Sequence, residues 1–370
     1  MTGTAAAPAP GRTRMFKLLA LGISGLASLA VAEGILRVFP GLQTVEIRQM
    51  LDADPRNYGV AHPYIGHLHR PRSTIVIPSR DFTASHHTDG LGFRNAWPWA
   101  AQADVAIVGD SVTFGYGVAD GDAWPAILAK NLSPETVINL GLIGAGPQQY
   151  LRVYETFGVE LRPKLLIVGF LASNDFWDAG VFDEWLKSGT GGNYMVWRDF
   201  GRSFLASHSY LYQILRTAAH QIVRPRPVVR EFADGSRIQL QPDALADRAR
   251  YVQPDRQEFR LAVDAIDQLR MRATEQGTHV LVVLQPGKEE VYLPLTDPSV
   301  PDPERPLREA LDRLRIEYLD LTPGFRQRAA AGARLFFEVD GHPNAAGYAL
   351  IAELLRAYLV EHAHRYGLAE

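Results

Sequence analysis

The sequence predicts an α/β fold: a flavodoxin-like, doubly wound, five-stranded parallel sheet with helices on both faces, preceded by an N-terminal membrane helix. Two observations predict the sheet. Short unbroken apolar runs alternate five times with segments whose apolar residues recur at helical spacing. Unbroken apolar runs are typical of strands that are buried on both faces. A third observation predicts the membrane helix, because basic residues near the amino terminus precede an uncharged apolar stretch.

Composition excludes several classes of protein. The chain has 370 residues, of which 46% are hydrophobic and 21% are charged, as in ordinary globular proteins. A formal net charge of −3 argues against a nucleic-acid partner, since nucleic-acid binders carry a basic excess. The chain has no cysteine, which excludes disulfides, cysteine-ligated metals, a thiol nucleophile and a lipidated amino-terminal cysteine.

The amino terminus is the first element in chain order. Residues 1–11 are rich in Ala, Pro, Gly and Thr and are expected to be disordered. Residues 12–38 are expected to form a signal-anchor or transmembrane helix, because the uncharged stretch 18–32 follows three basic residues, Arg12, Arg14 and Lys17. Basic residues stay on the cytoplasmic side, so the rest of the chain is expected on the periplasmic or extracellular side.

Cleavage of this segment is the alternative to its retention. Residues 30–32 (AVA) fit a cleavage site of the small-x-small type, and cleavage would leave a secreted protein. The 15 uncharged residues are also fewer than the roughly 20 that a span needs. Extension at both ends supplies the missing length but places Glu33 near the membrane interface. The sequence favours a retained anchor.

A connector with short strands is expected at residues 39–103, where Pro, Gly and His break every apolar run. The main domain is expected at 104–370. Its strands are expected at DVAIV (104–108), TVINL (136–140), LLIVGFL (165–171), HVLVVL (279–284) and EYLD (317–320). Its helices are expected at 124–132, 148–157, around 259–269, 305–314 and 345–360.

Residues 177–256 interrupt the alternation and are expected to be an insertion. An insertion between the third and fourth strands lies where a lid or substrate wall would lie, at the carboxyl edge of the sheet. The alternative is a scaffold segment whose aromatic residues only pack. Its basic cluster, Arg224, Arg226 and Arg230, either meets an anionic substrate or forms a solvated face.

The candidate catalytic residues follow the strands, because ligands bind open α/β sheets outside the carboxyl ends of the strands. Ser111 follows the first strand at a turn into a helix, which suits a nucleophile, although a Ser there could simply cap the helix. Gly144 follows the second strand and leaves room for a backbone N–H to approach a ligand, unless it only makes a tight turn. Asn174 follows the third strand, where its amide either donates to an oxyanion or caps a helix.

A histidine near the carboxyl terminus completes the set. His342 lies in a loop that leads into the last helix, and Asp340 precedes it by two residues. These residue types together support acyl transfer: His342 takes the proton of Ser111 as the hydroxyl attacks a carbonyl. The N–H groups of Ser111 and Gly144 and the amide of Asn174 would form the oxyanion hole.

This set resembles the SGNH hydrolase superfamily, the GDSL-like esterases and lipases. The resemblance covers roughly residues 104–362 without the insertion, in four blocks: GDSVTFG (109–115), NLGLIG (139–144), ND (174–175) and HPNAAG (342–347). The upstream segment DGLGFR (89–94) resembles membrane-anchored bacterial members. The resemblance implies esterase activity with Ser111, Gly144, Asn174 and His342 as site residues.

The acid of the triad departs from the family pattern. The family's acid lies three residues before the histidine, where this chain has Val339. Asp340 is our choice for orienting His342; Glu338, a backbone carbonyl or a Ser–His dyad without an acid are the alternatives. Asp110 is interpreted as a hydrogen-bonding residue of the nucleophile turn and not as the triad acid.

The predicted function is that of a membrane-tethered serine esterase acting on a short-chain acyl ester. The expected substrate is an acylated polysaccharide or lipid of the cell envelope. An O-acyltransferase that modifies an exported glycan is the alternative, followed by a catalytically inactive binding protein. No cofactor or metal is expected. The histidine pairs 67/69 and 86/87 lack carboxylates at metal-ligand spacing, and no nucleotide-binding motif occurs.

Overall fold

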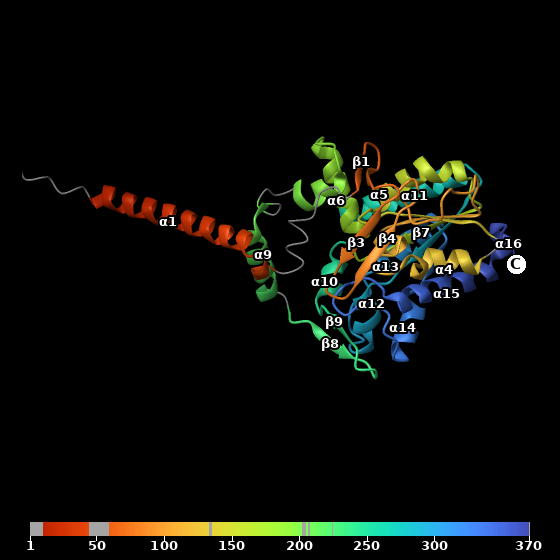
Figure 1. Ribbon diagram of the computed structural model, residues 1–370. Helices are drawn as coiled ribbons and strands as arrows, with labels where there is room; N and C mark the ends of the chain where they lie inside the picture. The colour runs from red at the N-terminus through yellow and green to blue at the C-terminus, as the bar shows by residue number, and fades with distance from the viewer. Residues whose placement is uncertain are drawn as a thin grey trace, which may run out of the picture. The chain divides into compact units, whose positions relative to one another are not determined.

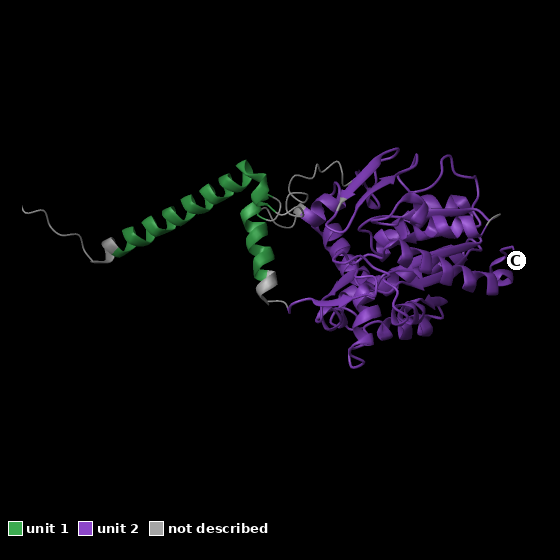
Figure 2. Ribbon diagram, turned by 60° about the horizontal axis from the view of Figure 1, so that its bottom comes forward, with its two compact units in different colours: residues 1–53, 200–223 green, residues 54–199, 224–370 purple. Residues whose placement is uncertain are grey.

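The computed structural model describes residues 10–43, 59–132, 135–201, 205, 208–223 and 225–369. The chain divides into two compact units (Figure 2). Unit 1 comprises residues 1–53 and 200–223, and unit 2 comprises residues 54–199 and 224–370. The predicted disorder of residues 1–11 concerns mostly residues outside the described part, and the first described residue, Pro10, already belongs to a helix.

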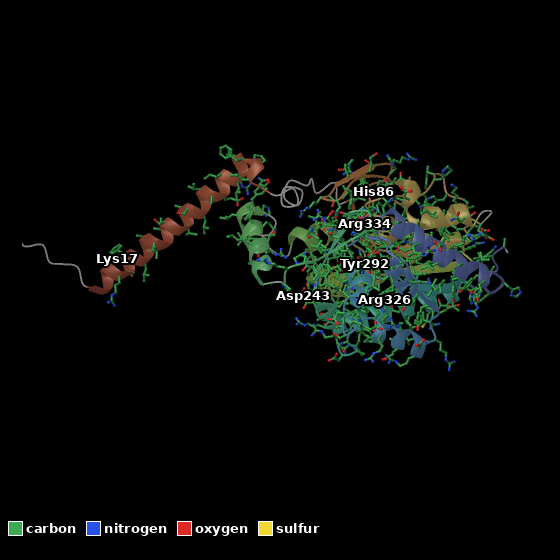
Figure 3. All side chains as sticks on the ribbon, turned by 90° about the horizontal axis from the view of Figure 1, so that it is seen from below. Lys17, His86, Asp243, Tyr292, Arg326 and Arg334 are labelled. Atoms are coloured by element: carbon green, nitrogen blue, oxygen red, sulfur yellow. The ribbon has the colours of Figure 1, made fainter. Side chains whose placement is uncertain are left out.

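Unit 1 consists of helical segments: α1 (Pro10–Val38), the 3₁₀ turn η1 (Pro40–Leu42) and α9 (Tyr210–Val223). Lys17 lies near the amino-terminal end of α1 (Figure 3). Residues Arg14–Val38 are long and apolar enough to cross a membrane, and none of that window is buried. A signal sequence near an amino terminus has the same properties, so length and composition leave the expected anchor and a signal equally open.

Helices α1 and α9 are joined through Glu33. The carboxylate of Glu33 accepts hydrogen bonds from Ser209 Oγ at 2.9 Å and from the backbone N–H of Leu211 at 3.0 Å and Tyr210 at 3.3 Å. Arg37, one turn further along α1, pairs with the same carboxylate at 2.9 Å. Glu33 thus caps the first turn of α9, whose N–H groups have no partner within the helix.

The sheet of unit 2 confirms the predicted fold class (Figure 1). Its strands are β5 (Val105–Gly109), β6 (Val137–Gly141), β7 (Leu165–Phe170), β10 (His279–Leu284) and β11 (Tyr318–Asp320). All neighbours are parallel and the strand order is β11-β10-β7-β5-β6. This is the flavodoxin-like order, with the first strand beside the second and the third.

Both faces of the sheet are buried, which explains the unbroken apolar runs. Side chains alternate along each strand, so that Ala106 and Val108 of β5 face one core while Val105 and Ile107 face the other. Helices on the first face are α5 (Pro147–Val153), α6 (Asp175–Ser188), α11 (Gln257–Thr274) and α13 (Arg305–Leu314). Helices on the second face are α4 (Trp124–Asn131), α12 (Lys288–Tyr292), α14 (Thr322–Ala330), α15 (Ala345–Glu361) and α16 (Ala363–Tyr366).

The helix predicted at 148–157 changes its winding partway. Helix α5 continues as a π turn, η4 (Tyr154–Gly158), and a 3₁₀ turn, η5 (Val159–Leu161). Regular α-helical winding therefore ends at Val153, earlier than predicted, and a wider and then a tighter turn follow.

Short elements complete unit 2. The connector contributes two antiparallel hairpins, β1 (Val60–His62) with β2 (Gly66–Leu68) and β3 (Thr74–Pro78) with β4 (Thr83–His87). The segment between β7 and β10 contributes α7 (Tyr194–Val196), the π turn η6 (Trp197–Gly201), the hairpin β8 (Val228–Glu231) with β9 (Arg237–Leu240), and α10 (Ala244–Ala249). The remaining turns are α3 (Ser111–Phe114), η3 (Asp120–Asp122) and η7 (Leu293–Leu295).

Candidate active site

Three glycines seat the nucleophile turn on the sheet. Gly109 ends β5 and pairs with Gly141 of β6 and Gly169 of β7. A Cβ at Gly109 or Gly169 would lie 2.1 or 2.3 Å from the hydroxyl of Thr113, and one at Gly141 would lie 2.5 Å from the backbone nitrogen of Phe114. Only glycines let the short helix α3 lie directly on the ends of these strands, and Ser111 is its first residue.

Asp110 caps that helix. Its Oδ1 accepts the backbone N–H of Val112 at 2.9 Å, and its Oδ2 accepts the side-chain amide of Asn174 at 3.2 Å. Burial raises the pKa of Asp110, although these hydrogen bonds act in the opposite direction. The carboxyl group therefore joins the nucleophile turn to the turn of Asn174. The sequence predicts its hydrogen bonds to the nucleophile turn.

Ser111, His342 and Asp340 lie in one hydrogen-bonded chain. Ser111 Oγ is 2.8 Å from His342 Nε2, and His342 Nδ1 is 2.6 Å from Asp340 Oδ1. The carboxylate only accepts, so Nδ1 carries the proton and Nε2 is free to accept the proton of Ser111. The same Asp340 oxygen accepts the backbone N–H of His342 at 2.8 Å, which fixes the ring against the loop.

The structure distinguishes between the candidate acids. Glu338 directs its carboxylate to the amide of Gln239 at 3.3 Å and not to the imidazole. Burial alone would raise the pKa of Asp340, but the hydrogen bonds from His342 outweigh it and the pKa lies below its ordinary value. Asp340 is thus an anion at neutral pH. The ring of Tyr116 stacks on the imidazole of His342, with the two ring centroids 4.3 Å apart.

Gly144 and Asn174 are the donors expected beside the N–H of Ser111. Gly144 adopts φ +73°, which L residues with side chains rarely adopt, and a Cβ there would lie 2.5 Å from Arg198 and 2.6 Å from the sulfur of Met195. Within the described part of the chain, its N–H donates no hydrogen bond to protein. The Asn174 amide gives one hydrogen to Asp110 and keeps a second for a ligand oxygen.

Two histidines of the connector hold Ile143, the residue before Gly144. His67 Nε2 lies 2.9 Å from the carbonyl oxygen of Ile143, and His69 Nε2 accepts the Ile143 N–H at 3.3 Å. Burial lowers the pKa of His67 to about 3 and that of His69 to about 4, so both rings are neutral. Because a carbonyl and the following N–H point in opposite directions, the bond from His67 aims the Gly144 N–H away from His67.

Arg198 holds the other side of Gly144. Its Nη1 donates to the Gly144 carbonyl at 3.0 Å, and its Nη2 pairs with Asp178 at 3.3 Å. Burial raises the pKa of Asp178 to about 7, against the opposing effect of Arg198. Arg198 was not predicted as a site residue, because a hydrogen bond to a backbone carbonyl 54 residues away leaves no pattern in the sequence.

Other parts of the insertion that the structure describes pack within unit 2. Trp185, Tyr194 and Met195 form a small buried cluster with Val181 and Phe182. Arg230 lies over the rings of Phe232 and Tyr292, and Arg224 lies outside the described residues. Among the described residues, no three His, Asp or Glu side chains are grouped to hold a metal ion.

Comparison with known proteins gives a family match. The family model described as "GDSL-like Lipase/Acylhydrolase family" matches residues 107–350. No curated protein matches the chain.

Similar solved structures include a G-D-S-L lipolytic protein from Veillonella parvula DSM 2008 (16% identity, 69% of this chain and 96% of that chain, TM-score 0.36). Another is a putative G-D-S-L lipolytic protein from Desulfitobacterium hafniense DCB-2 (16% identity, 69% and 99%, TM-score 0.38). A two-domain esterase active on acetylated mannans is also similar (12% identity, 70% and 49%, TM-score 0.39).

The family match covers more than half of the chain and includes the nucleophile turn, the Gly144 loop, the Asn174 turn and the loop of His342. The chain therefore belongs to the GDSL-like lipase/acylhydrolase family and is a carboxylic ester hydrolase.

Proposed function

We propose that this protein is a membrane-tethered serine esterase that hydrolyses a short-chain acyl ester through Ser111, His342 and Asp340. The observation that carries the proposal is the chain of two hydrogen bonds, 2.8 and 2.6 Å long, from the Ser111 hydroxyl through His342 to Asp340. A hydroxyl is a weak nucleophile unless a base is within hydrogen-bond reach of it, and here the base is in turn oriented by an acid.

The reaction follows from these positions. Ser111 Oγ attacks the ester carbonyl while His342 Nε2 takes its proton, and Asp340 stabilises the imidazolium that forms. The N–H groups of Ser111 and Gly144 and the amide of Asn174 stabilise the oxyanion of the tetrahedral intermediate. His342 then protonates the leaving alcohol. Water attacks the acyl-enzyme by the same route, which releases the acid and restores Ser111.

Two features of α1 support membrane tethering: its apolar length, and the hydrogen bonds made by Glu33, its one acidic residue. A carboxylate near the membrane interface is costly unless it is paired. Glu33 is paired: Arg37, Ser209 and the first N–H groups of α9 all donate to it. With the basic residues Arg14 and Lys17 on the cytoplasmic side, unit 2 would lie on the periplasmic or extracellular side, where envelope esters are its substrates.

The test uses the full chain in detergent. A fluorophosphonate probe is expected to label the wild type, and p-nitrophenyl acetate is expected to be hydrolysed; Ser111→Ala removes labelling and lowers kcat by roughly 10⁴-fold or more. Ser299→Ala, at an exposed serine, is the matched control. Wild-type turnover by Ser111→Ala would overturn the proposal. Turnover that appears only with a sugar acceptor would assign the chain to acyl transfer instead.

A further inference from the structure

The loop that carries Asp340 and His342 lies against a buried lysine. Lys288 is the first residue of α12 and is 2% exposed. Its Nζ donates to three successive backbone carbonyls, those of Glu338 at 3.2 Å, Val339 at 3.0 Å and Asp340 at 3.1 Å. An ammonium group has three hydrogens, so the three carbonyls satisfy all of them.

An aspartate from the connector lies against the N–H side of the same loop. Asp81 is in the turn between β3 and β4, and its Oδ2 accepts the backbone N–H of Val339 at 2.9 Å and of Asp340 at 2.6 Å. Hydrogen bonds with a charged partner are about twice as strong as neutral ones. Five charge-assisted hydrogen bonds thus converge on three consecutive residues.

The two charges act on the same peptide groups. The carbonyl of Glu338 and the N–H of Val339 belong to one planar peptide, and the carbonyl of Val339 and the N–H of Asp340 belong to the next. In both peptides the oxygen faces the Lys288 ammonium and the N–H faces the Asp81 carboxylate. Rotation of either peptide would separate it from both charges, so this arrangement fixes the backbone at Asp340.

Burial of this lysine needs an explanation beyond packing. Isolated charges are costly to bury, and burial lowers the pKa of Lys288 in spite of the nearby carboxylates of Glu289, Asp340, Asp81 and Glu338. No side-chain carboxylate within ion-pair distance of Lys288 occurs among the described residues. Its hydrogen bonds go to the backbone of residues 338–340, so we infer that the buried ammonium group stabilises this loop.

We propose that Lys288 and Asp81 are positioning residues that hold the backbone of residues 338–340 so that the Asp340 carboxylate meets His342. The proposal rests on the proposed roles of Ser111, His342 and Asp340. A misplacement of about 1 Å in a catalytic group can lower the rate by roughly 100-fold, so loss of either charge acts on turnover more than on substrate binding.

The first experiment compares Lys288→Met and Asp81→Asn with the wild type, using the full chain in detergent. Each variant is expected to lower kcat roughly 10- to 100-fold with little change in KM, with kcat expressed per site titrated by the fluorophosphonate. Arg308→Met is the control for loss of a half-buried cation, because Arg308 pairs with Asp302 and Asp320 away from the loop. It is expected to lower the unfolding temperature but not kcat.

A spectroscopic readout does not depend on turnover. The proton shared by His342 Nδ1 and Asp340 should give a far-downfield ¹H NMR resonance in the wild type and in Arg308→Met. It is expected to shift or disappear in Lys288→Met and in Asp81→Asn. Wild-type kcat and an unchanged resonance in both variants would overturn the inference, while an inactive Ser111→Ala would still uphold the proposed mechanism.

Rescue and coupling sharpen the test. The chain has no cysteine, so Lys288→Cys offers a single thiol. Because residue 288 is buried, this thiol is alkylated with 2-bromoethylamine in urea before refolding, which restores an amine of nearly the original length. We expect it to recover most of the lost kcat. The double variant Lys288→Met/Asp81→Asn is expected to lose less than the product of the two single effects, because both charges act on the same peptides. If alkylation fails to restore kcat and the effects of the two substitutions on kcat multiply independently, Lys288 and Asp81 do not hold residues 338–340 together.

Discussion

The Gly144 loop and the Asp340 loop carry the expected partners of the same serine but are held in different ways. Neutral side chains and one arginine hold the first: His67 and His69 bond to Ile143, and Arg198 bonds to the Gly144 carbonyl. Two opposite charges, those of Lys288 and Asp81, hold the second.

The origin of these side chains is as informative as their chemistry. His67, His69 and Asp81 all come from the hairpin region that precedes the sheet, which the sequence suggested was a connector. Arg198 comes from the segment between β7 and β10. Lys288 is the exception, because it comes from α12, directly after β10. Most of the side chains that hold the two loops thus come from segments outside the regular alternation of strands and helices. This difference leads to tests that separate the two loops.

Among the tests that separate the two loops, the largest effect is expected at the acid. Asp340→Ala removes the only carboxylate bonded to His342 among the described residues, and we expect kcat to fall on the order of 10³- to 10⁴-fold. Glu338→Ala changes the neighbouring acid, which bonds to Gln239, and is expected to stay near the wild type. Kinetics of both variants with p-nitrophenyl acetate provide the measurement. A larger loss in Glu338→Ala would reverse the assignment of the acid.

A smaller effect is expected at the glycine of the oxyanion hole. Gly144→Ala would place a Cβ 2.5 Å from Arg198 at φ +73°, so the loop must shift and its N–H must move. Loss of one oxyanion donor lowers kcat by roughly 10²- to 10³-fold. Gly341 of the other loop has open space around it, and Gly341→Ala is the matched comparison. Equal kcat values for the two variants would show that Gly144 does not serve as a donor.

The sheet and the residues after its strands were predictable because they leave local patterns. Strands such as β5 and β7 are buried on both faces, so every residue in them is apolar, and Ser111, Gly144 and Asn174 follow strand ends as the topology requires. The acid was harder to predict, since a side chain in a loop can turn either way. The structure places Asp340 and not Glu338 against the imidazole.

The groups that hold the two loops were not predictable from one sequence. His67, Arg198 and Lys288 bond to backbone carbonyls, and any residue presents a carbonyl, so no partner type or spacing marks these contacts. The sequence predicts no role for His67 and His69. A buried lysine and neutral histidines are visible only once the fold shows what surrounds them.

The smallest expected effect is on stability and depends on the neutrality of the histidines behind Gly144. The folded-state pKa of His67, about 3, lies below the value of about 6.5 in unfolded chains. Between these values the unfolded state binds more protons, so the free energy of unfolding falls as the pH is lowered from 6.5. His67 alone is expected to contribute a slope of about 1 kcal/mol per pH unit.

His67→Gln keeps a donor for the Ile143 carbonyl but cannot be protonated in this range, so the slope between pH 6.5 and 4.5 is expected to be shallower than in the wild type. All six tryptophans lie in unit 2, so their fluorescence during urea unfolding of the full chain in detergent reports on that unit alone. His364→Gln, at an exposed position, controls for the loss of a histidine as such. An unchanged slope in His67→Gln would mean that the ring is not held neutral, and the Gly144 loop would then be held by charges, as the Asp340 loop is.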